Sequence, residues 1–418
     1  MKAAVLSIGD EILAGFILNA NARTLSQMLI DEGYEVNRHL SVGDEITTIV
    51  EACYSLAEDR DLVMVTGGLG PTHDDKTMEA CALAMGVETA VDKDSLERLQ
   101  DFFTRRGRTM KDIHRRMATF PIGATVVPNP VGAADGFTFT LGDCQFLCMP
   151  GVPAEMNAVA TFFLKHYQRN TKERCYRAQR ILSLCGVPES EAALRMQGLL
   201  EGDGYKMGLL PNDSVLRIRI SSQSEQSSQH AVDIAENLIR RIAPLFKPHE
   251  VFSYDNEELH VVILQELQKR NWQLALAESC TGGRLCDTIV AVSGASQTLV
   301  FGGVFYANSS KEQILKVLPD TIETHGAVSE PVAEQMAQGV CALSNAHCSI
   351  ATTGVAGPDG GTDDKPVGTV CIATKVGDKV ESRQYLFSGN RELIRRRASQ
   401  AALIQLLRQL RDQQPSTT

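Results

Sequence analysis

Hydrophobic and polar positions in the first third of the chain alternate between two patterns. Short apolar runs typical of strands cover residues 3–8, 34–41 and 61–66. Stretches with helical spacing cover residues 21–32, 45–58 and 77–85. This alternation predicts an α/β fold, with a mainly parallel sheet that has helices on both faces. Sites in such folds lie at the carboxyl ends of the strands.

The pattern changes between residues 128 and 153, which are rich in glycine and proline and exclude a long helix. Two apolar runs, at residues 136–140 and 145–148, flank a turn and predict a β-hairpin. A helix predicted over residues 154–167 closes the first domain.

A smaller α+β unit follows. Strands are predicted over residues 176–184 and 215–220, helices over 189–200 and 229–242, and a polar loop over 221–228. This order is KH-like and resembles the KH-type fold, but no Gly-x-x-Gly loop of the kind that clamps RNA is present. A structural or interface role is therefore favoured over nucleic-acid binding.

The last part of the chain begins after a linker predicted at residues 252–258. Helices are predicted over residues 259–270, 284–290 and 393–410, a strand over 272–276, and a frayed tail over 413–418. We therefore expect three domains, at residues 1–168, 172–251 and 257–412.

Composition narrows the classes of protein that fit. At 418 residues the chain is long enough for two or three domains, and its net charge of −10 argues against a general nucleic-acid surface. The eleven cysteines are scattered and contain no Cys-x-x-Cys pair, which suits reduced thiols rather than a disulfide or zinc site. We see no signal peptide and no apolar run that could span a membrane, so a cytoplasmic location is expected.

The turn Ser279-Cys280-Thr281-Gly282-Gly283 carries the clearest candidate chemistry. It joins the strand predicted at residues 272–276 to the helix predicted at 284–290. A hydroxyl there lies beside free N–H groups at the positive end of a helix, where an oxyanion is stabilised. Tyr306 and Lys311 could supply the base that a nucleophilic serine needs. The alternative is that Ser279 only caps the helix.

Three acidic or glycine-rich clusters follow predicted strands in the first domain, at residues 9–11, 43–45 and 66–75. Glycines in the third cluster let the backbone approach a phosphate, and the neighbouring carboxylates suit a hard divalent cation. Together they fit a metal-assisted attack on a phosphoanhydride. The alternative for a single aspartate, Asp10 or Asp44, is a helix N-cap.

Four ordered motifs in this domain resemble the molybdopterin-binding fold and, more closely, the amino-terminal domain of the CinA family. They are Gly-Asp-Glu-Ile-Leu at 9–13, Thr-Gly-Gly-Leu-Gly-Pro-Thr at 66–72, Pro-Asn-Pro-Val-Gly at 128–132 and Pro-Gly-Val-Pro-Ala-Glu-Met at 150–156. The resemblance implies an ADP-ribose pyrophosphatase that releases AMP and ribose 5-phosphate with a divalent metal, Mg²⁺, Mn²⁺ or Co²⁺.

By that resemblance Asp44 and Asp75 are the functional carboxylates. The remaining residues assigned to this site are Gly67, Gly68 and Gly70, with Asp10, Glu11 and Asp74 as candidate metal ligands. The chain departs from the family at His114 and Met117, where an Asn and a Gln are common. The alternatives for Arg105, Arg106 and Arg108 are substrate binding and a solvated basic loop.

From residue 277 onward the chain resembles the CinA carboxyl-terminal domain, which also occurs alone as nicotinamide mononucleotide deamidase. The matching segments are residues 277–283, 306–311, 325–331, 354–361, 365–370 and 387–391. The implied reaction converts nicotinamide mononucleotide to nicotinic acid mononucleotide and ammonia, and no cofactor is expected for it.

The resemblance assigns Ser279 as nucleophile, with Cys280 as the open alternative, and Lys311 as base. Tyr306 would relay the proton or hold the lysine. The N–H groups around Thr281, Gly282 and Gly283 are the expected oxyanion donors, and Thr353 and Arg391 complete the pattern, with Arg391 suited to a phosphate or carboxylate.

The resemblance thus implies a hydrolase of pyridine-nucleotide salvage with two activities, whose partners are the small nucleotides nicotinamide mononucleotide and ADP-ribose, and we expect it to be cytoplasmic. No nucleic-acid or membrane partner is expected, and a homodimer is expected because most soluble oligomers are two-fold symmetric. The alternatives are that only one domain is active, or that the protein is a non-catalytic molybdopterin-binding or competence-associated scaffold.

Overall fold

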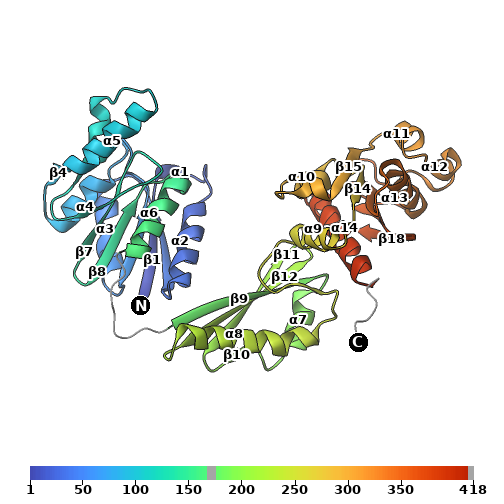
Figure 1. Cartoon of the computed structure of the whole chain (residues 1–418), viewed down its shortest axis with the longest axis horizontal. Helices are drawn as coiled ribbons and strands as arrows, with labels where there is room; N and C mark the ends of the chain where they lie inside the picture. The colour runs from blue at the N-terminus through green and yellow to red at the C-terminus, as the bar shows by residue number, and fades with distance from the viewer. Residues whose placement is uncertain (167–175, 413–418) are drawn as a thin grey trace. The chain divides into compact units, whose positions relative to one another are not determined.

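The computed structural model describes residues 1–166 and 176–412, which form two compact units (Figure 1). The first unit comprises residues 1–178 with 222–232, and the second comprises 179–221 with the remainder of the chain. The predicted three-domain division stays a prediction. Its limits at 168 and 172, and the predicted frayed tail at 413–418, lie outside the described residues.

The first sheet has six strands in the order β2-β1-β3-β8-β7-β6. They are β1 (Lys2–Ile8), β2 (Glu35–Val42), β3 (Leu62–Thr66), β6 (Thr125–Val127), β7 (Gly136–Leu141) and β8 (Cys144–Met149). Strands β2, β1, β3 and β8 are parallel, and β7 and β6 add antiparallel pairs. The mainly parallel sheet and the predicted hairpin, now β7 and β8, are confirmed.

Helices cover both faces of this sheet (Figure 1). They are α2 (Ala20–Asp31), α3 (Ile46–Ala57), α4 (Thr77–Met85) and α6 (Pro153–His166), while the short helix α1 (Asp10–Leu13) follows β1 and buries none of its residues. Because successive strand residues point to opposite faces, Ala3 and Val5 of β1 pack with α2 and α6, whereas Ala4 and Leu6 pack with α3 and α4. The apolar strands are therefore buried on both sides, and polar residues are left for their ends.

Residues 89–121, for which no elements were predicted, form a small extension of the first unit. It contains β4 (Thr89–Val91), α5 (Lys93–Arg105), the 3₁₀ helix η1 (Asp112–Ala118) and β5 (Thr119–Pro121). Strands β4 and β5 pair antiparallel in a sheet of their own.

The middle sheet has five strands in the order β10-β11-β12-β9-β13. Its elements are β9 (Tyr176–Cys185), α7 (Glu189–Arg195), β10 (Glu201–Gly202), β11 (Tyr205–Asn212), β12 (Val215–Ser224), α8 (Ser228–Ile242), η2 (Ala243–Leu245) and β13 (Val251–Ser253). These strands and helices form the predicted α+β arrangement.

Three local predictions in this region are wrong. The predicted loop at 221–228 begins as strand, because β12 continues to Ser224 with alternating burial. The helix predicted over 189–200 ends at Arg195, and Gly198 with φ of 84° marks the turn that follows. The predicted linker at 252–258 begins inside β13, which pairs with β9 and is buried.

The third sheet has the order β15-β14-β16-β17-β18. Its strands are β14 (Leu274–Glu278), β15 (Leu299–Val304), β16 (Cys348–Gly354), β17 (Thr369–Val376) and β18 (Lys379–Leu386). Strands β15, β14 and β16 are parallel, and β17 and β18 add antiparallel pairs. The helices are α9 (Leu259–Lys269), α10 (Arg284–Val290), η3 (Ala295–Gln297), α11 (Asn308–Gln313), α12 (Pro319–His325), α13 (Glu330–Ser344) and α14 (Arg391–Asp412).

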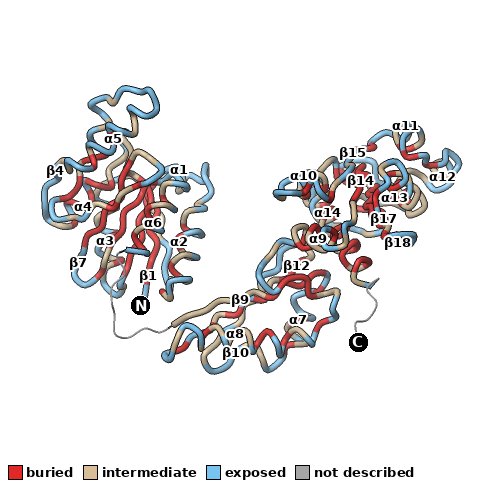
Figure 2. The backbone as a smooth tube through the Cα atoms, in the orientation of Figure 1, coloured by how far each residue is buried: buried red, intermediate tan, exposed pale blue. Residues whose placement is uncertain are grey.

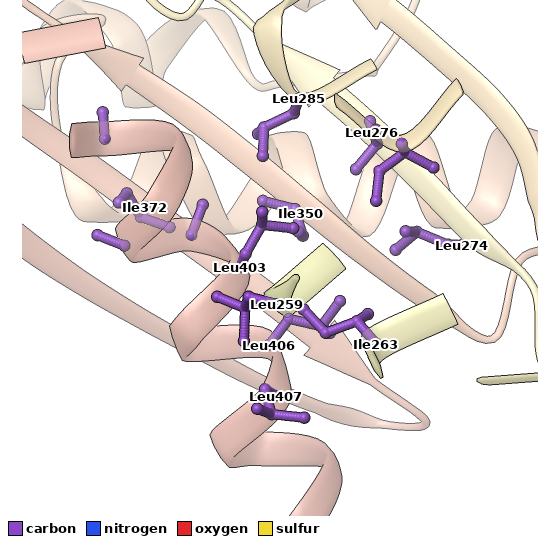
Figure 3. Packing of buried hydrophobic residues seen from close by; sticks show 14 of the residues in the cluster. Leu259, Ile263, Leu274, Leu276, Leu285, Ile350, Ile372, Leu403, Leu406 and Leu407 are labelled. Carbon is purple, nitrogen blue, oxygen red and sulfur yellow. The ribbon is translucent and has the colours of Figure 1, made fainter. Parts of the chain in front are cut away.

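Two apolar layers hold this third sheet, and Figure 2 shows buried positions along its strands. On one face Leu274, Leu276 and Ile350 pack against α9 and α14, as Figure 3 shows around Leu406. On the other face small strand residues such as Ala275 pack against α13. The parallel strands β14 and β16 end at the same edge of the sheet, which is where the candidate chemistry gathers. Among the described residues, no helix combines the length and the apolarity needed to cross a membrane.

Candidate active sites

Ser279 and Lys311 meet at the carboxyl end of β14. Ser279 directly follows the strand, and Lys311 lies on the short helix α11. The Lys311 Nζ donates to Ser279 Oγ over 3.3 Å and to the Tyr306 carbonyl over 3.1 Å. The structure therefore brings together the two residues that the sequence proposes as nucleophile and base.

Lys311 is buried, with only 1% of its surface exposed. Burial lowers the pKa of its ammonium group, because the charged form loses its hydration. A solvated lysine would be the ordinary outcome at the start of a polar helix. The observed burial instead favours a lysine that can be neutral and accept a proton.

Tyr306 holds the lysine through its backbone rather than its phenol. Its side chain is 65% exposed, and its hydroxyl lies 3.5 Å from Arg391 Nη2. Arg391, at the start of α14, also donates to the Gly357 carbonyl over 2.6 Å. Of the two predicted roles for Tyr306, holding Lys311 has a contact in the structure, and the proton relay has none among the described residues.

A cavity of about 160 Å³ opens beside this pair. Its lining includes all five residues that the sequence assigned to catalysis: Ser279, Tyr306, Lys311, Thr353 and Arg391. Thr353, at the end of β16, donates from its hydroxyl to the Ala327 carbonyl over 2.8 Å, which leaves its oxygen as an acceptor. Asn308, which the sequence analysis missed, also lines the cavity.

Two of the three expected oxyanion donors are occupied, which corrects that prediction. The Gly282 N–H donates to the Ser279 carbonyl over 3.2 Å, and the Gly283 N–H donates to the Glu278 carboxylate over 2.9 Å. The Glu278 carboxylate, at the amino end of α10, thus takes the Gly283 donor that a substrate oxyanion would use. The Thr281 N–H meets no acceptor within residues 1–166 and 176–412.

Cys280, the alternative nucleophile, faces an unfavourable environment. Its side chain is 6% exposed and packs within the apolar layer that contains Leu285. Burial raises the pKa of its thiol to about 12, so the thiolate is scarce at neutral pH. The geometry favours Ser279.

A second cavity, of about 550 Å³, lies at the carboxyl ends of the first sheet's parallel strands. The assigned residues Glu11, Asp44, Gly67, Gly68, Gly70, Asp74 and Asp75 all line it. Gly67 and Gly68 have φ of 110° and 68°, which glycine adopts at little steric cost. The three predicted clusters therefore converge on one cavity.

Asp10 and Asp44 form a reciprocal pair beside this cavity. The Asp10 N–H donates to Asp44 Oδ2 over 3.0 Å, and the Asp44 N–H donates to Asp10 Oδ1 over 3.3 Å. Burial raises the pKa of Asp44, and the neighbouring charges of Asp10, Glu11 and Asp74 act in the same direction. A site that crowds carboxylates in this way gains from a bound cation.

The Asp75 carboxylate accepts hydrogen bonds from residues of its own loop. Its Oδ1 accepts the Gly70 N–H over 2.8 Å, and its Oδ2 accepts the Thr72 N–H and hydroxyl over 2.8 and 2.5 Å. Arg116 donates to the Thr72 and Asp75 carbonyls over 2.9 and 3.1 Å. Asp74 is exposed beside them, and the hydroxyl of Thr72 lowers the pKa of its carboxylate. These bonds keep the glycine-rich loop open toward the cavity.

Within the part of the chain that the structure describes, no three His, Cys, Asp or Glu side chains are arranged to hold a metal. The predicted ligand set Asp10, Glu11 and Asp74 is therefore not assembled as a cage. The carboxylate oxygens around the cavity still suit Mg²⁺, which is commonly bound by one or two carboxylates together with substrate phosphates.

Several residues at this cavity were missed from the sequence. Asn21 donates to Thr66 Oγ1 over 3.1 Å and to the Gly151 carbonyl over 2.8 Å, which ties α2 to two strand ends. Glu155, which also lines the cavity, accepts from Asn129 over 2.7 Å. The signal for Glu155 was its place in the motif at 150–156, whereas Asn21 looked like an ordinary helix-start residue.

The two positions that depart from the family pattern lie in different surroundings. Met117 is buried and lines the cavity, so an apolar side chain stands there in place of the family's amide. His114 lies against Phe103, with ring centroids 4.4 Å apart and ring planes tilted by 32°, and it accepts the Lys111 N–H through Nδ1. Arg105, Arg106 and Arg108 are exposed, and none of them lines the cavity.

Two family models match separate parts of the chain. Residues 256–410 match the family described as the CinA C-terminal domain, and residues 4–169 match a probable molybdopterin binding domain. The chain is similar to a CinA-like protein of Desulfosudis oleivorans, with 36% identity over 98% of this chain and 100% of that protein. It is also 33% identical to a putative competence-damage inducible protein of Caldanaerobacter subterraneus, over 99% of this chain and 100% of that one.

Among solved structures, the chain is similar to competence damage-inducible protein A from Klebsiella pneumoniae. The identity is 35% and the TM-score 0.37, over 37% of this chain and 97% of that one.

Proposed function

This chain belongs to the CinA family, and from that premise we propose that its carboxyl-terminal site hydrolyses the carboxamide of nicotinamide mononucleotide. The products are nicotinic acid mononucleotide and ammonia. One observation carries the proposal: a serine hydroxyl at a strand end lies 3.3 Å from the Nζ of a buried lysine. Such a pair is an activated nucleophile of the serine–lysine type.

In the proposed reaction, neutral Lys311 removes the Ser279 proton while Ser279 Oγ attacks the carboxamide carbon. The tetrahedral intermediate then collapses, and Lys311 returns the proton to the leaving nitrogen, so that ammonia departs and a nicotinoyl ester remains on Ser279. Water hydrolyses this ester by the same proton transfers in reverse order. Of the predicted oxyanion donors we retain the Thr281 N–H.

Arg391 supplies the positive charge that the nucleotide needs. It lines the cavity beside Ser279, and one of its nitrogens is engaged by the Gly357 carbonyl. A guanidinium with a remaining N–H face suits the phosphate of a mononucleotide.

The test is ammonia release from nicotinamide mononucleotide by the purified protein. Ser279→Ala should reduce kcat by more than about 1000-fold, whereas Cys280→Ala should leave it within about twofold. An inactive wild-type protein would refute the deamidase. Loss of activity in Cys280→Ala with retention in Ser279→Ala would transfer the role of nucleophile to the cysteine.

We propose a second activity for the larger cavity, the metal-dependent hydrolysis of ADP-ribose to AMP and ribose 5-phosphate. It rests on the convergence of a glycine-rich loop with the carboxylates Glu11, Asp44 and Asp74 on one cavity. The backbone of Gly67, Gly68 and Gly70 can approach the pyrophosphate closely. Glu11, Asp44 and Asp74 line the cavity and Asp44 pairs with Asp10, so we propose that these carboxylates hold the divalent ion.

A bound divalent ion would supply charge neutralisation of the pyrophosphate and a more acidic water. The protein residues position the reacting groups. Asp75 holds the glycine-rich loop through the Gly70 N–H, and the hydrogen bonds between Asp10 and Asp44 fix the positions of these two carboxylates.

AMP release from ADP-ribose, with and without added Mg²⁺, Mn²⁺ or Co²⁺, tests this activity. Asp44→Asn should lower kcat by at least about 100-fold, since a ligand of the metal loses its charge. Asp101→Asn, at an exposed position of α5, is the matched control and should be unaffected. If the wild-type protein binds ADP-ribose but releases no AMP under any of these metals, this segment is a binding scaffold instead.

A further inference from the structure

We infer that Glu278 and Arg395 are positioning residues that hold the turn at residues 279–283 in the shape that brings Ser279 to Lys311. The inference rests on the proposed deamidase function, which it deepens. The two side chains hydrogen-bond to different backbone groups of this turn, and neither lines the cavity itself. They would act on catalysis through Ser279.

Glu278 ends β14 and is completely buried. Its carboxylate accepts three backbone N–H groups: those of Gly283 over 2.9 Å, Leu285 over 3.2 Å and Cys286 over 2.8 Å. Burial, and after it the proximity of Glu278, raises the pKa of the Cys286 thiol to about 12. A charged group is tolerated at such depth only when hydrogen bonds replace its hydration, and here they do.

The placement of these donors explains why the turn has one shape. Residue 278 precedes Ser279, and its three backbone partners follow Gly282, so the carboxylate closes a loop around the nucleophile. Gly282 and Gly283 have φ of 63° and 91°, which lets the chain turn back toward Glu278. Without the carboxylate, this backbone would keep its flexible glycines and lose its common acceptor.

Arg395 binds the turn at a different residue, Thr281. Its Nε and Nη2 both donate to the Thr281 carbonyl, over 3.2 and 2.8 Å. This paired donation to one oxygen requires the fork of N–H groups that a guanidinium provides. The approach is close, because a Cβ added to Gly282 would stand 3.1 Å from Arg395 Nη2. Arg395 follows Arg391 by one turn of α14, so the same helix serves the cavity and the nucleophile turn.

The backbone of Glu278 connects the nucleophile to the base. The Glu278 carbonyl accepts the Phe305 N–H over 2.6 Å. The residue after Phe305 is Tyr306, whose carbonyl accepts from Lys311 Nζ. Displacement of residue 278 would therefore move Ser279 and the acceptor of Lys311 together. A misplacement of about 1 Å between reacting groups can cost about 100-fold in rate.

The decisive variant is Glu278→Gln, which keeps the size of the side chain but removes the charge and replaces one acceptor oxygen with a donor. We expect kcat for ammonia release to fall by about 100-fold, with KM for nicotinamide mononucleotide changed by less than about threefold. The midpoint of the pH profile of kcat should stay where it is in the wild type, because Glu278 orients groups and does not exchange the proton.

The matched control is Glu330→Gln in the same domain. Glu330 accepts the Gln384 N–H over 3.1 Å and the Ser382 hydroxyl over 3.0 Å, and it does not line the cavity. This variant should lower the melting temperature without changing kcat for the folded protein. If Glu278→Gln behaves in the same way, its role is structural and the inference is overturned.

Arg395 gives an independent test should Glu278→Gln fail to fold. Arg395→Met should lower kcat by about 10-fold, and Arg395→Lys, which keeps one donor, should recover part of the loss. Equal, wild-type kcat in both variants would overturn the inference for Arg395. Activity of the wild-type protein separates these outcomes from failure of the proposed function, because an inactive wild type refutes the deamidase before any variant is compared.

Discussion

Lys311 shows how one residue can be correctly chosen from a sequence while its environment stays hidden. Its place in a polar segment, Asn308 to Lys311, gives no sign of burial, yet the side chain is almost fully enclosed. Enclosure comes from packing of distant segments around α11, which no local pattern encodes. The motif resemblance could name the residue, and only the fold could show why its pKa is lowered.

This burial leads to a prediction about stability. The pKa of Lys311 lies below its ordinary value of 10.5 in the folded protein, so the unfolded chain binds the proton more tightly. The free energy of unfolding therefore rises with pH until the unfolded-state pKa is passed. Lys311→Met should remove this slope, and at pH 7 it should stabilise the protein by on the order of 1 kcal/mol while abolishing ammonia release.

Thermal unfolding from pH 6 to 10 measures this effect. The advantage of Lys311→Met should shrink as the pH rises toward 10.5, whereas Lys269→Met, at an exposed position of α9, should show no such trend. A variant less stable than the wild type at every pH would mean that the lysine is held charged by its partners.

Cys280 gives a second prediction at this scale. Because its thiol is buried and its pKa is raised to about 12, iodoacetamide at pH 7 should leave it unmodified for an hour and spare the activity. Peptide mass spectrometry of native and urea-unfolded protein checks this directly. Rapid modification of Cys280 in the native protein, with loss of ammonia release, would favour the cysteine as nucleophile.

Glu278 marks the limit of prediction for the candidate site. The five assigned catalytic residues were found from motifs, and the structure gathers them on one cavity. Glu278 was overlooked because an acidic residue at a strand end looks like a solvated terminus. Its burial and its bonds to Gly283 depend on the way the chain folds back after two left-handed glycines.

At the scale of elements, prediction succeeded where clear signals mark the ends of a segment, even a short one. The helices at 77–85 and 284–290 were predicted with the observed bounds of α4 and α10. Strand β11 was missed because Gly208 and Pro211 interrupt it, and glycine and proline are read as strand breakers. Tertiary pairing with β12 overrides that local preference.

The junction after β3 gives a prediction for an element. Gly67 has φ of 110°, and a Cβ there would overlap the Ile8 carbonyl oxygen of the neighbouring strand. Gly67→Ala therefore combines backbone strain with a clash against backbone that cannot move. We expect it to destabilise the amino-terminal unit by about 3 kcal/mol or more and to weaken ADP-ribose binding.

The matched control is Gly86→Ala at the end of α4. Gly86 also has a positive φ, of 69°, but an added Cβ meets nothing within 4 Å. This variant should cost only the strain of a left-handed residue, about 1 kcal/mol. Thermal unfolding and calorimetric titration with ADP-ribose compare the two, and equal effects would show that the close approach at Gly67 is relieved elsewhere.

At the scale of the whole molecule, the oligomeric state stays a prediction. We expect a homodimer, since two-fold symmetric dimers are the commonest soluble oligomers. Light scattering after size exclusion should then give twice the chain mass of 45.6 kDa. A monomer at micromolar concentration would contradict this expectation. No nucleic-acid partner is expected for a chain of net charge −10.

The separation of the two cavities leads to the prediction that bears most on the molecule as a whole. Of the described residues, all that line the larger cavity belong to the first compact unit, and all that line the smaller one belong to the second. Changes at separated sites without shared contacts act independently. Ser279→Ala should therefore abolish ammonia release and leave AMP release within about twofold, and Asp44→Asn should do the opposite.

A chelator should stop only AMP release, because the Ser279 and Lys311 pair needs no metal for its proton transfers. Loss of both activities in either variant would mean that the units are coupled, and that each cavity depends on the state of the other.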